Sequence, residues 1–200
     1  DADFTKFTAA LAVNKSLQKL YIRSFSKKSD EADRSKSGYV DRAAQLFNAL
    51  QEAYRDQGQR LTLLDYSRSR FYSRESKNAI LGYLELNQQM QILRPSLYDF
   101  GVRDLQRFAD IIKSHPRLTT LLTGISQKEG AGALIAEACK EAFHHKFRHL
   151  YPFSSREKNP HVQANQQALF AAQQTLQEWS ESGAAAHDMG TEHWALFNFS

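Results

Sequence analysis

One apolar pattern occurs four times in the first 128 residues of the chain, at intervals of 29 and 28 residues between the last three copies and of 61 − 17 = 44 residues between the first two. In the clearest copy, a helix-like stripe of Leu105, Phe108 and Ile112 is followed by Leu118 and Leu121. The first residues of the matching Leu-x-x-Leu pairs are Leu17, Leu61, Met90 and Leu118. A fixed period of roughly 20–50 residues is typical of repeat arrays, in which each unit buries its apolar face against its neighbours. The pattern therefore predicts about four stacked units.

The short apolar segment of each copy carries a recognisable signature. The matching pieces are Asn14–Ile22, Leu61–Tyr66, Asn87–Leu93 and His115–Leu121. They resemble leucine-rich repeats, and the 28–29 residue length is similar to the ribonuclease-inhibitor-like type. That resemblance implies an α/β solenoid, in which each unit has a strand on the concave side, a loop, and a helix on the convex side. It covers residues 1–128, with a polar, charged insertion near 24–38.

The copies also depart from this family. The asparagine that the family carries eight positions after the first strand leucine is replaced by Phe25, Ser69, Tyr98 and Ser126. We therefore expect the usual asparagine ladder to be missing. The third apolar position of the strand is held by Ile22, Tyr66, Pro95 and Thr123. Because the last two are poor strand core residues, we expect irregular strands from the third unit on. An all-α domain is the alternative, since Leu-x-x-Leu pairs also occur in helical proteins.

The pattern fades after Gly130, where we expect a helical cap and tail over 129–200. Gly132–Leu150 is predicted to be one helix, with Phe143 and Phe147 on its apolar side. Asn159 and Pro160 predict the start of a second helix, because asparagine caps helices and proline suits their first position. Arrays need such a cap to cover their last apolar face. The last ten residues are apolar enough to dock back on the body.

Composition limits the class of protein. Hydrophobic residues make up 42% of the sequence, which favours a folded chain, and the net charge of +4 permits acidic partners without requiring them. The single Cys139 excludes an internal disulfide, and no window is apolar enough to span a membrane. We expect a cytoplasmic protein. Since the first residue is not Met, we also expect a processed chain or part of a longer one.

Few residues in the sequence indicate a catalytic or metal-binding site. His145 and His149 would share a face of the predicted helix, but the intervening Lys146 repels a metal ion and no carboxylate cluster completes a site. Cys139 lies among apolar helix residues and is predicted to be a buried thiol. Because no nucleophile elbow, phosphate-binding loop or carboxylate pair is present, we predict that the protein is not an enzyme and uses no metal, cofactor or small-molecule substrate.

The remaining candidate for a functional site is the surface formed by the predicted strands. Residues between the buried leucines should point to the concave face, because side chains alternate along a strand. The aligned strands give three rows: Lys19, Leu63, Ile92 and Thr120; Tyr21, Asp65, Arg94 and Leu122; and Arg23, Ser67, Ser96 and Gly124. Exposed tyrosine and arginine are common in interface hot spots. We therefore predict that this strip, flanked by Arg68 and Arg70, binds another protein.

Two further hypotheses come from the same residues. The irregular units, the single cysteine and the helical cap resemble repeat proteins that bacteria secrete into the cytosol of host cells. The alternative function is an all-helical domain that contacts a membrane or nucleic acid through basic residues, namely Arg68, Arg70, Arg74 and those of the 27–36 stretch. Arginines alternate with aromatic residues over 66–74, an arrangement that could stack bases, although Phe71 or Tyr72 could equally pack beneath a turn.

Overall fold

Short strands and helices alternate throughout the part of the chain that the computed structural model describes, which is residues 2–22, 41–71, 73–124, 126–153 and 158–182. In chain order the elements are α1 (Ala2–Ala12), β1 (Lys19–Tyr21), α3 (Arg42–Gln57), β2 (Leu63–Asp65), α4 (Arg74–Leu86), β3 (Ile92–Arg94), α5 (Val102–Ser114), β4 (Thr120–Thr123), α6 (Ala131–Phe143), β5 (His149–Pro152) and α7 (Pro160–Glu181). The predicted insertion at 24–38, and the tail from 183 onward, lie outside the described residues.

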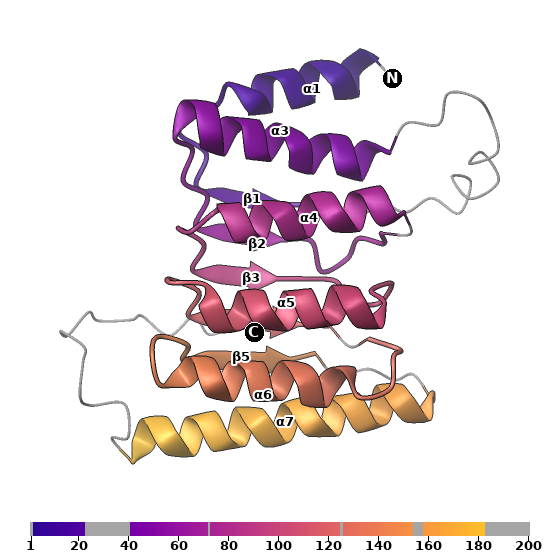
Figure 1. The fold of residues 1–200 in the computed structure, drawn as a ribbon, viewed down its shortest axis with the longest axis vertical. Helices are drawn as coiled ribbons and strands as arrows, with labels where there is room; N and C mark the ends of the chain where they lie inside the picture. The colour runs from indigo at the N-terminus through magenta and orange to yellow at the C-terminus, as the bar shows by residue number, and fades with distance from the viewer. Residues whose placement is uncertain (1, 23–40, 72, 125, 154–157, 183–200) are drawn as a thin grey trace, which may run out of the picture.

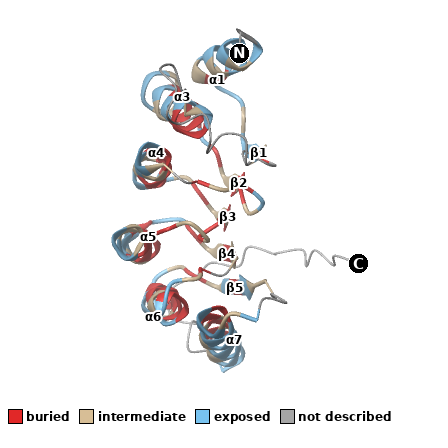
Figure 2. Ribbon diagram, turned by 90° about the vertical axis from the view of Figure 1, so that its right-hand side faces the viewer, coloured by how far each residue is buried: buried red, intermediate tan, exposed pale blue. Residues whose placement is uncertain are grey.

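The strands form one parallel sheet in which spatial order follows chain order, β1 to β5. Each helix packs against the next along the chain, so the helices form a single layer on one face of the sheet (Figures 1 and 2). None of the described helices packs on the other face of the sheet. This architecture is an α/β solenoid closed by a C-terminal helix, and it confirms the predicted fold class over the all-α alternative.

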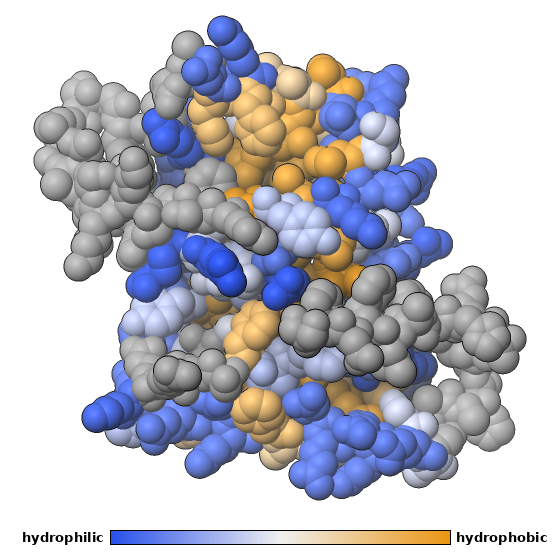
Figure 3. Space-filling view, turned by 180° about the vertical axis from the view of Figure 1, so that it is seen from behind, coloured by the Kyte–Doolittle hydropathy of each residue, from blue (hydrophilic) through white to orange (hydrophobic). Residues whose placement is uncertain are grey.

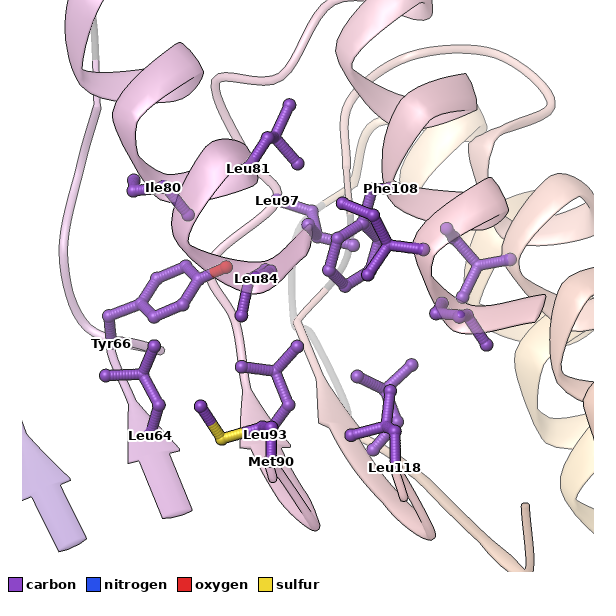
Figure 4. Close-up of a cluster of buried hydrophobic side chains, with 14 of the residues drawn as sticks. Leu64, Tyr66, Ile80, Leu81, Leu84, Met90, Leu93, Leu97, Phe108 and Leu118 are labelled. Atoms are coloured by element: carbon purple, nitrogen blue, oxygen red, sulfur yellow. The ribbon is translucent and has the colours of Figure 1, made fainter. Parts of the chain in front are cut away.

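The core lies between the strands and the helix layer. Its most regular part is one leucine per strand, aligned across the sheet: Leu20, Leu64, Leu93, Leu121 and Leu150. A second layer contains the first apolar residue of each unit, including Leu61, Met90 and Leu118, and Figure 4 shows the helix side chains that meet both layers. The repeated leucines of the sequence are therefore the residues that hold helix to strand in every unit.

Local signals set most helix ends. Asp41 caps α3 by accepting a hydrogen bond from the Ala44 N–H, and Gly58 ends the helix with a φ of +66°, a conformation that glycine adopts without strain. Asn159 caps α7 as predicted. Ser73 caps helix α4, because its Oγ accepts a hydrogen bond from the Ser76 N–H.

The helix predicted over 132–150 is wrong in its last third. Helix α6 ends at Phe143, and His149–Pro152 forms β5, which pairs in parallel with β4. Phe143 and Phe147 are four residues apart, so they look like one helical stripe. In fact Phe147 follows Leu118 by 29 residues and is fully buried, as Leu118 is. The alternation of strand and helix therefore continues beyond residue 128.

The expected irregularity of the later strands is also wrong. Strand β3 has three residues, as β1 and β2 have, and β4 has four. Pro95 comes immediately after β3, where its missing N–H removes no bond within the strand. Thr123 is buried, and its hydroxyl donates to the Gly124 carbonyl at 2.8 Å. Local hydrogen bonding thus makes a polar residue tolerable at this core position.

Buried polar side chains connect neighbouring units at the turns from helix to strand. Asn87 donates from Nδ2 to the Leu61 carbonyl at 2.8 Å, and His115 Nε2 lies 2.8 Å from the Asn87 carbonyl. Gln59 makes a similar bond to the Asn14 carbonyl at 3.2 Å. These bonds satisfy carbonyls that would otherwise be unpaired inside the protein. They link the units at a different place from the asparagine ladder, whose position the sequence fills with other residues.

Candidate partner-binding surface

The sheet aligns the predicted surface residues in the predicted order. Lys19 pairs with Leu63, Leu63 with Ile92, and Ile92 with Thr120, while Tyr21, Asp65 and Arg94 align two residues further along. Strand β5 extends these rows with His149 and Tyr151, opposite Thr120 and Leu122. We call the following ten residues the strand face: Lys19, Leu63, Ile92, Thr120, His149, Tyr21, Asp65, Arg94, Leu122 and Tyr151.

None of the ten side chains is buried, and exposure is greatest at the two ends. Tyr21 on β1 is 54% exposed and Tyr151 on β5 is 42% exposed. Leu63, Ile92 and Leu122 lie between them at intermediate exposure. Figure 3 shows this side of the molecule, where apolar patches lie among hydrophilic ones. Such a mixture of aromatic, aliphatic and charged groups is typical of protein-binding surfaces.

An ion pair occupies the middle of the strand face. Arg94 Nη1 lies 3.0 Å from Asp65 Oδ2, and the other oxygen of that carboxylate accepts a hydrogen bond from the Ser67 hydroxyl at 2.8 Å. The guanidinium of Arg94 also lies 5.6 Å from the ring centroid of Phe153. Arg94 Nε has no hydrogen-bond partner among the described residues. The centre of the face is therefore neutral overall.

The β5 end carries two stacked rings. His149 and Tyr151 lie with centroids 6.0 Å apart and ring planes 18° from parallel. Desolvation lowers the pKa of His149, and the positive charge of Arg148 lowers it further. The ring is thus uncharged at neutral pH and adds flat, uncharged surface beside Tyr151. Sequence reasoning placed neither residue on this surface, although the 29-residue interval from Leu118 to Phe147 could have located their strand.

The predicted flanking arginines have different surroundings. Arg68 is exposed. Arg70 binds Asp99 through two hydrogen bonds of 2.9 Å, and its guanidinium lies 3.8 Å from the centroid of the Tyr98 ring. The same carboxylate accepts from the Phe71 N–H at 3.0 Å. Arg70 therefore joins two successive strand-to-helix loops.

The third predicted row differs from the first two. Ser96 is buried, whereas Ser67 and Gly124 are half-buried and Arg23 lies outside the described residues. The aromatic residues of the nearby basic stretch belong to the core: Phe71 and Tyr66 are buried and their rings meet edge to face, with centroids 5.4 Å apart. Packing beneath the turn is therefore confirmed for Phe71. Tyr72 is not described.

The structure also shows the surroundings of the histidines and of Cys139, which the sequence analysis had considered for chemistry. Because α6 ends at Phe143, His145 and His149 do not share a helix face, which corrects that expectation. No group of three or more potential metal ligands occurs in the described part of the chain. Cys139 is fully buried as predicted, and burial raises the pKa of its thiol. Among the described helices, none is both long and apolar enough to cross a bilayer.

Comparison with known proteins gives no further guide, since neither a family model nor a curated protein matches the chain.

Proposed function

We propose that the protein is a non-enzymatic recognition module of the leucine-rich-repeat type, which binds another protein across its strand face. The observation that carries this proposal is the alignment of two rows of partly exposed side chains over five strands, on the side away from the helices. With strands about 4.8 Å apart, the rows extend about 19 Å, enough for a short segment of a partner.

The chemistry of the face favours a protein partner. Tyr21 and Tyr151 offer large aromatic surfaces at the two ends, and tyrosine loses little conformational freedom on binding. Between them, Leu63, Ile92 and Leu122 provide apolar contact area around a neutral ion pair. A nucleic acid or an anionic membrane would instead require an excess of free positive charge.

The alternative function, through basic loops, has less support. Arg70, one of its principal residues, already binds the Asp99 carboxylate. The two hypotheses differ in salt dependence, because phosphate contacts weaken steeply as salt concentration rises. That the protein is secreted by a bacterium into host cells, where it would act on a host protein, remains a proposal that depends on the family resemblance. Detection of the tagged protein in host cytosol during infection would test it.

The test of the strand face begins with partner identification by crosslinking, followed by calorimetry with the purified pair. Changing Tyr21 and Tyr151 together to alanine should weaken binding by more than tenfold, since aromatic anchors carry much of interface affinity. Phe170→Ala is the matched control, because this ring is 41% exposed on α7 and is not one of the strand-face residues. Unchanged affinity in the double variant would contradict the proposal. Steep loss of binding with added salt would favour the basic-loop alternative.

A further inference from the structure

The turns that lead from helix to strand lie along one edge of the sheet, on the left of Figure 1, where the strand arrows begin. Backbone hydrogen bonds between neighbouring turns hold them side by side, because each turn accepts from the next through the carbonyls of Gln18, Thr62, Gln91 and Thr119. We call the five residues before each strand the amino edge: 14–18, 58–62, 87–91, 115–119 and 144–148.

Positive charge is concentrated on the amino edge. Among its residues are five basic side chains and no carboxylate: Lys15, Arg60, Arg117, Lys146 and Arg148. The opposite edge, formed by the strand-to-helix loops, mixes the two signs, since Asp99 and Glu129 accompany Arg68 and Lys128 there. The net charge of the whole chain is +4, so the amino edge accounts for all of its positive excess.

These cations have no counter-charge within the described part of the chain. Lys15, Arg60 and Arg117 are exposed and form no ion pair with a described residue. The carboxylates at nearby helix ends bind elsewhere, since Glu85 pairs with Arg107 at 2.5 Å and Glu141 pairs with Lys113 at 3.0 Å. Asp56, at the end of α3, is exposed and pairs with no described cation. The amino edge therefore presents open positive charge.

Two of the five cations are also partly withdrawn from water. Lys146 Nζ donates to the Lys113 carbonyl at 3.4 Å, and Arg148 Nη1 donates to the carbonyls of Phe143 and Phe147 at 2.6 and 2.8 Å. Burial lowers the pKa of both side chains, because their hydrogen-bond partners are neutral and do not replace the lost water. A carboxylate brought to this end of the edge would stabilise both charges.

The other groups on the edge favour one kind of anionic partner. Single-stranded nucleic acid stacks its bases on aromatic rings, but no described residue of the edge is an exposed Phe, Tyr or Trp. An anionic membrane is held most firmly where apolar side chains also insert, whereas the leucines and Met90 of the edge are directed into the core. Gln18 and Gln88 are exposed amides, which suit the donors and acceptors of a peptide backbone.

We propose that the amino edge binds an acidic, extended segment of a protein partner. This inference rests on the proposed function, because a partner on the strand face would reach the edge, where Lys19 and His149 directly follow it. Five turns at the spacing of parallel strands extend about 19 Å, the length of about six extended residues. Charge complementarity of this kind speeds association and selects among partners that present similar apolar groups.

Zero-length crosslinking of the full 200-residue chain with a blocked hexaglutamate peptide would test the proposal. A carbodiimide joins a carboxylate to a lysine amine only where the two groups are in contact, and mass spectrometry identifies the modified lysine. We expect adducts at Lys15 and Lys146, which lie toward the two ends of the amino edge. Lys128 is the internal control, because it is exposed on the opposite edge and should remain unmodified.

Fluorescence anisotropy with the same labelled peptide would give the affinity. Arg60→Gln combined with Arg117→Gln should weaken binding roughly tenfold at low salt, since two exposed charge contacts are lost. Arg74→Gln combined with Arg103→Gln is the matched control, because it removes the same charge from exposed positions in the first turns of α4 and α5. Circular dichroism would verify that both double variants are folded.

Three results would overturn the inference. Adducts could form at Lys128 as readily as at Lys15 and Lys146, or the two arginine double variants could have equal effects. A hexathymidylate strand or phosphatidylserine vesicles could bind more tightly than the peptide and be released by the Arg60 and Arg117 changes, which would assign the edge to nucleic acid or to a membrane.

The strand face is tested separately from the amino edge. Tyr21→Ala combined with Tyr151→Ala should leave hexaglutamate binding unchanged, although it should weaken binding of the whole partner protein. If that variant keeps the whole partner and the Arg60 and Arg117 variant releases it, the strand-face proposal is wrong and the amino edge is retained. If the tyrosine variant releases the partner and the arginine variant affects neither partner nor peptide, the reverse holds.

Discussion

Arg94 and Asp65 form an ion pair across neighbouring strands, with Arg94 Nη1 3.0 Å from Asp65 Oδ2, at the centre of the strand face. The side chains are 31% and 15% exposed, so each charge has lost much of its contact with water. A charge in such a place depends on its partner, because removal of one member leaves the other poorly solvated. The pair thus holds two charges on a surface that is otherwise mainly apolar and aromatic.

Asp65→Asn should therefore destabilise the protein. The substitution preserves shape and the oxygen that accepts from Ser67, but it leaves Arg94 without its counter-charge. We expect a loss of about 1 kcal/mol in the free energy of unfolding, limited by the partial exposure of the pair. Urea denaturation would measure it. The double variant with Arg94→Met should recover part of the loss, and strict additivity of the two changes would show that the pair is not coupled.

The lowered pKa of His115 predicts that the stability of the protein depends on pH. Burial lowers its pKa from the usual 6.5, Lys146 lowers it further, and the bond to the Asn87 carbonyl opposes both effects. As pH falls below about 6.5, His115 therefore becomes protonated in the unfolded chain before it does in the native protein. The contribution of His115 is fully present above that pH and is lost progressively below it. Denaturation at pH 7.5 and at pH 5.5 should show lower stability at the acidic pH.

His115→Asn should reduce that dependence. His115 Nδ1 lies 3.2 and 3.0 Å from the N–H groups of Arg117 and Leu118, so it is the acceptor and Nε2 carries the proton that binds the Asn87 carbonyl. Asparagine holds the matching position in other units, where Asn14 accepts from the N–H groups of Ser16 and Leu17. We expect near-wild-type stability at pH 7.5 and a smaller loss at pH 5.5. His149, whose pKa is also lowered, should retain part of the slope. An unchanged pH profile would exclude His115 as a cause.

Strands, their register and helix caps could be predicted from the sequence where one local pattern has one structural role. The 28–29 residue interval predicts the strands β2 to β4, and the same pattern before the insertion predicts β1, because the first apolar residue of each copy enters the same core layer. The row of Lys19, Leu63, Ile92 and Thr120 follows directly from that register, as does the alignment of Tyr21, Asp65 and Arg94 in the second row. The cap at Asn159 was also readable, since its side chain bonds to an N–H group of the next turn.

Other features depend on contacts distant in sequence. Phe147 was assigned to a helix because a spacing of four residues from Phe143 suits both a helical stripe and a helix followed by a strand. The ion pair between Arg70 and Asp99 joins loops 29 residues apart, and nothing local distinguishes Arg70 from the exposed Arg68. Asn87 and His115 belong to the repeated pattern, but their bonds to the preceding unit, at the carbonyls of Leu61 and Asn87, become visible only when the units stack.

Two glycines within helices should respond oppositely to alanine. A Cβ at Gly132 in α6 would lie 2.2 to 2.6 Å from backbone atoms of Asn165, so the substitution must push α7 away. A Cβ at Gly82 in α4 would lie 3.4 Å from the flexible side chain of Gln51. We expect Gly132→Ala to cost on the order of 1–3 kcal/mol through overpacking. Gly82→Ala should be neutral or stabilise by up to about 1 kcal/mol, because alanine favours helix. Thermal and urea denaturation of the pair would measure the contrast. Equal effects would mean that α7 does not approach Gly132 closely.

The hydrogen bonds of Asn165 should hold helix α7 in place in addition to the apolar contacts that α7 makes. Its Oδ1 accepts from the Gly132 N–H, and its Nδ2 donates to the carbonyls of Ser126 and Lys128 at 2.9 and 2.7 Å. Asn165→Ala leaves these groups unpaired in a buried place, at a cost of about 2 kcal/mol. Because α7 is the last described element and packs on α6 and β5, the loss should first appear as faster amide exchange in residues 160–181. Asn48→Ala, at an exposed site on α3, is the matched control and should leave that exchange unchanged. Equal acceleration throughout the described units would show instead that α7 opens only when the whole array unfolds.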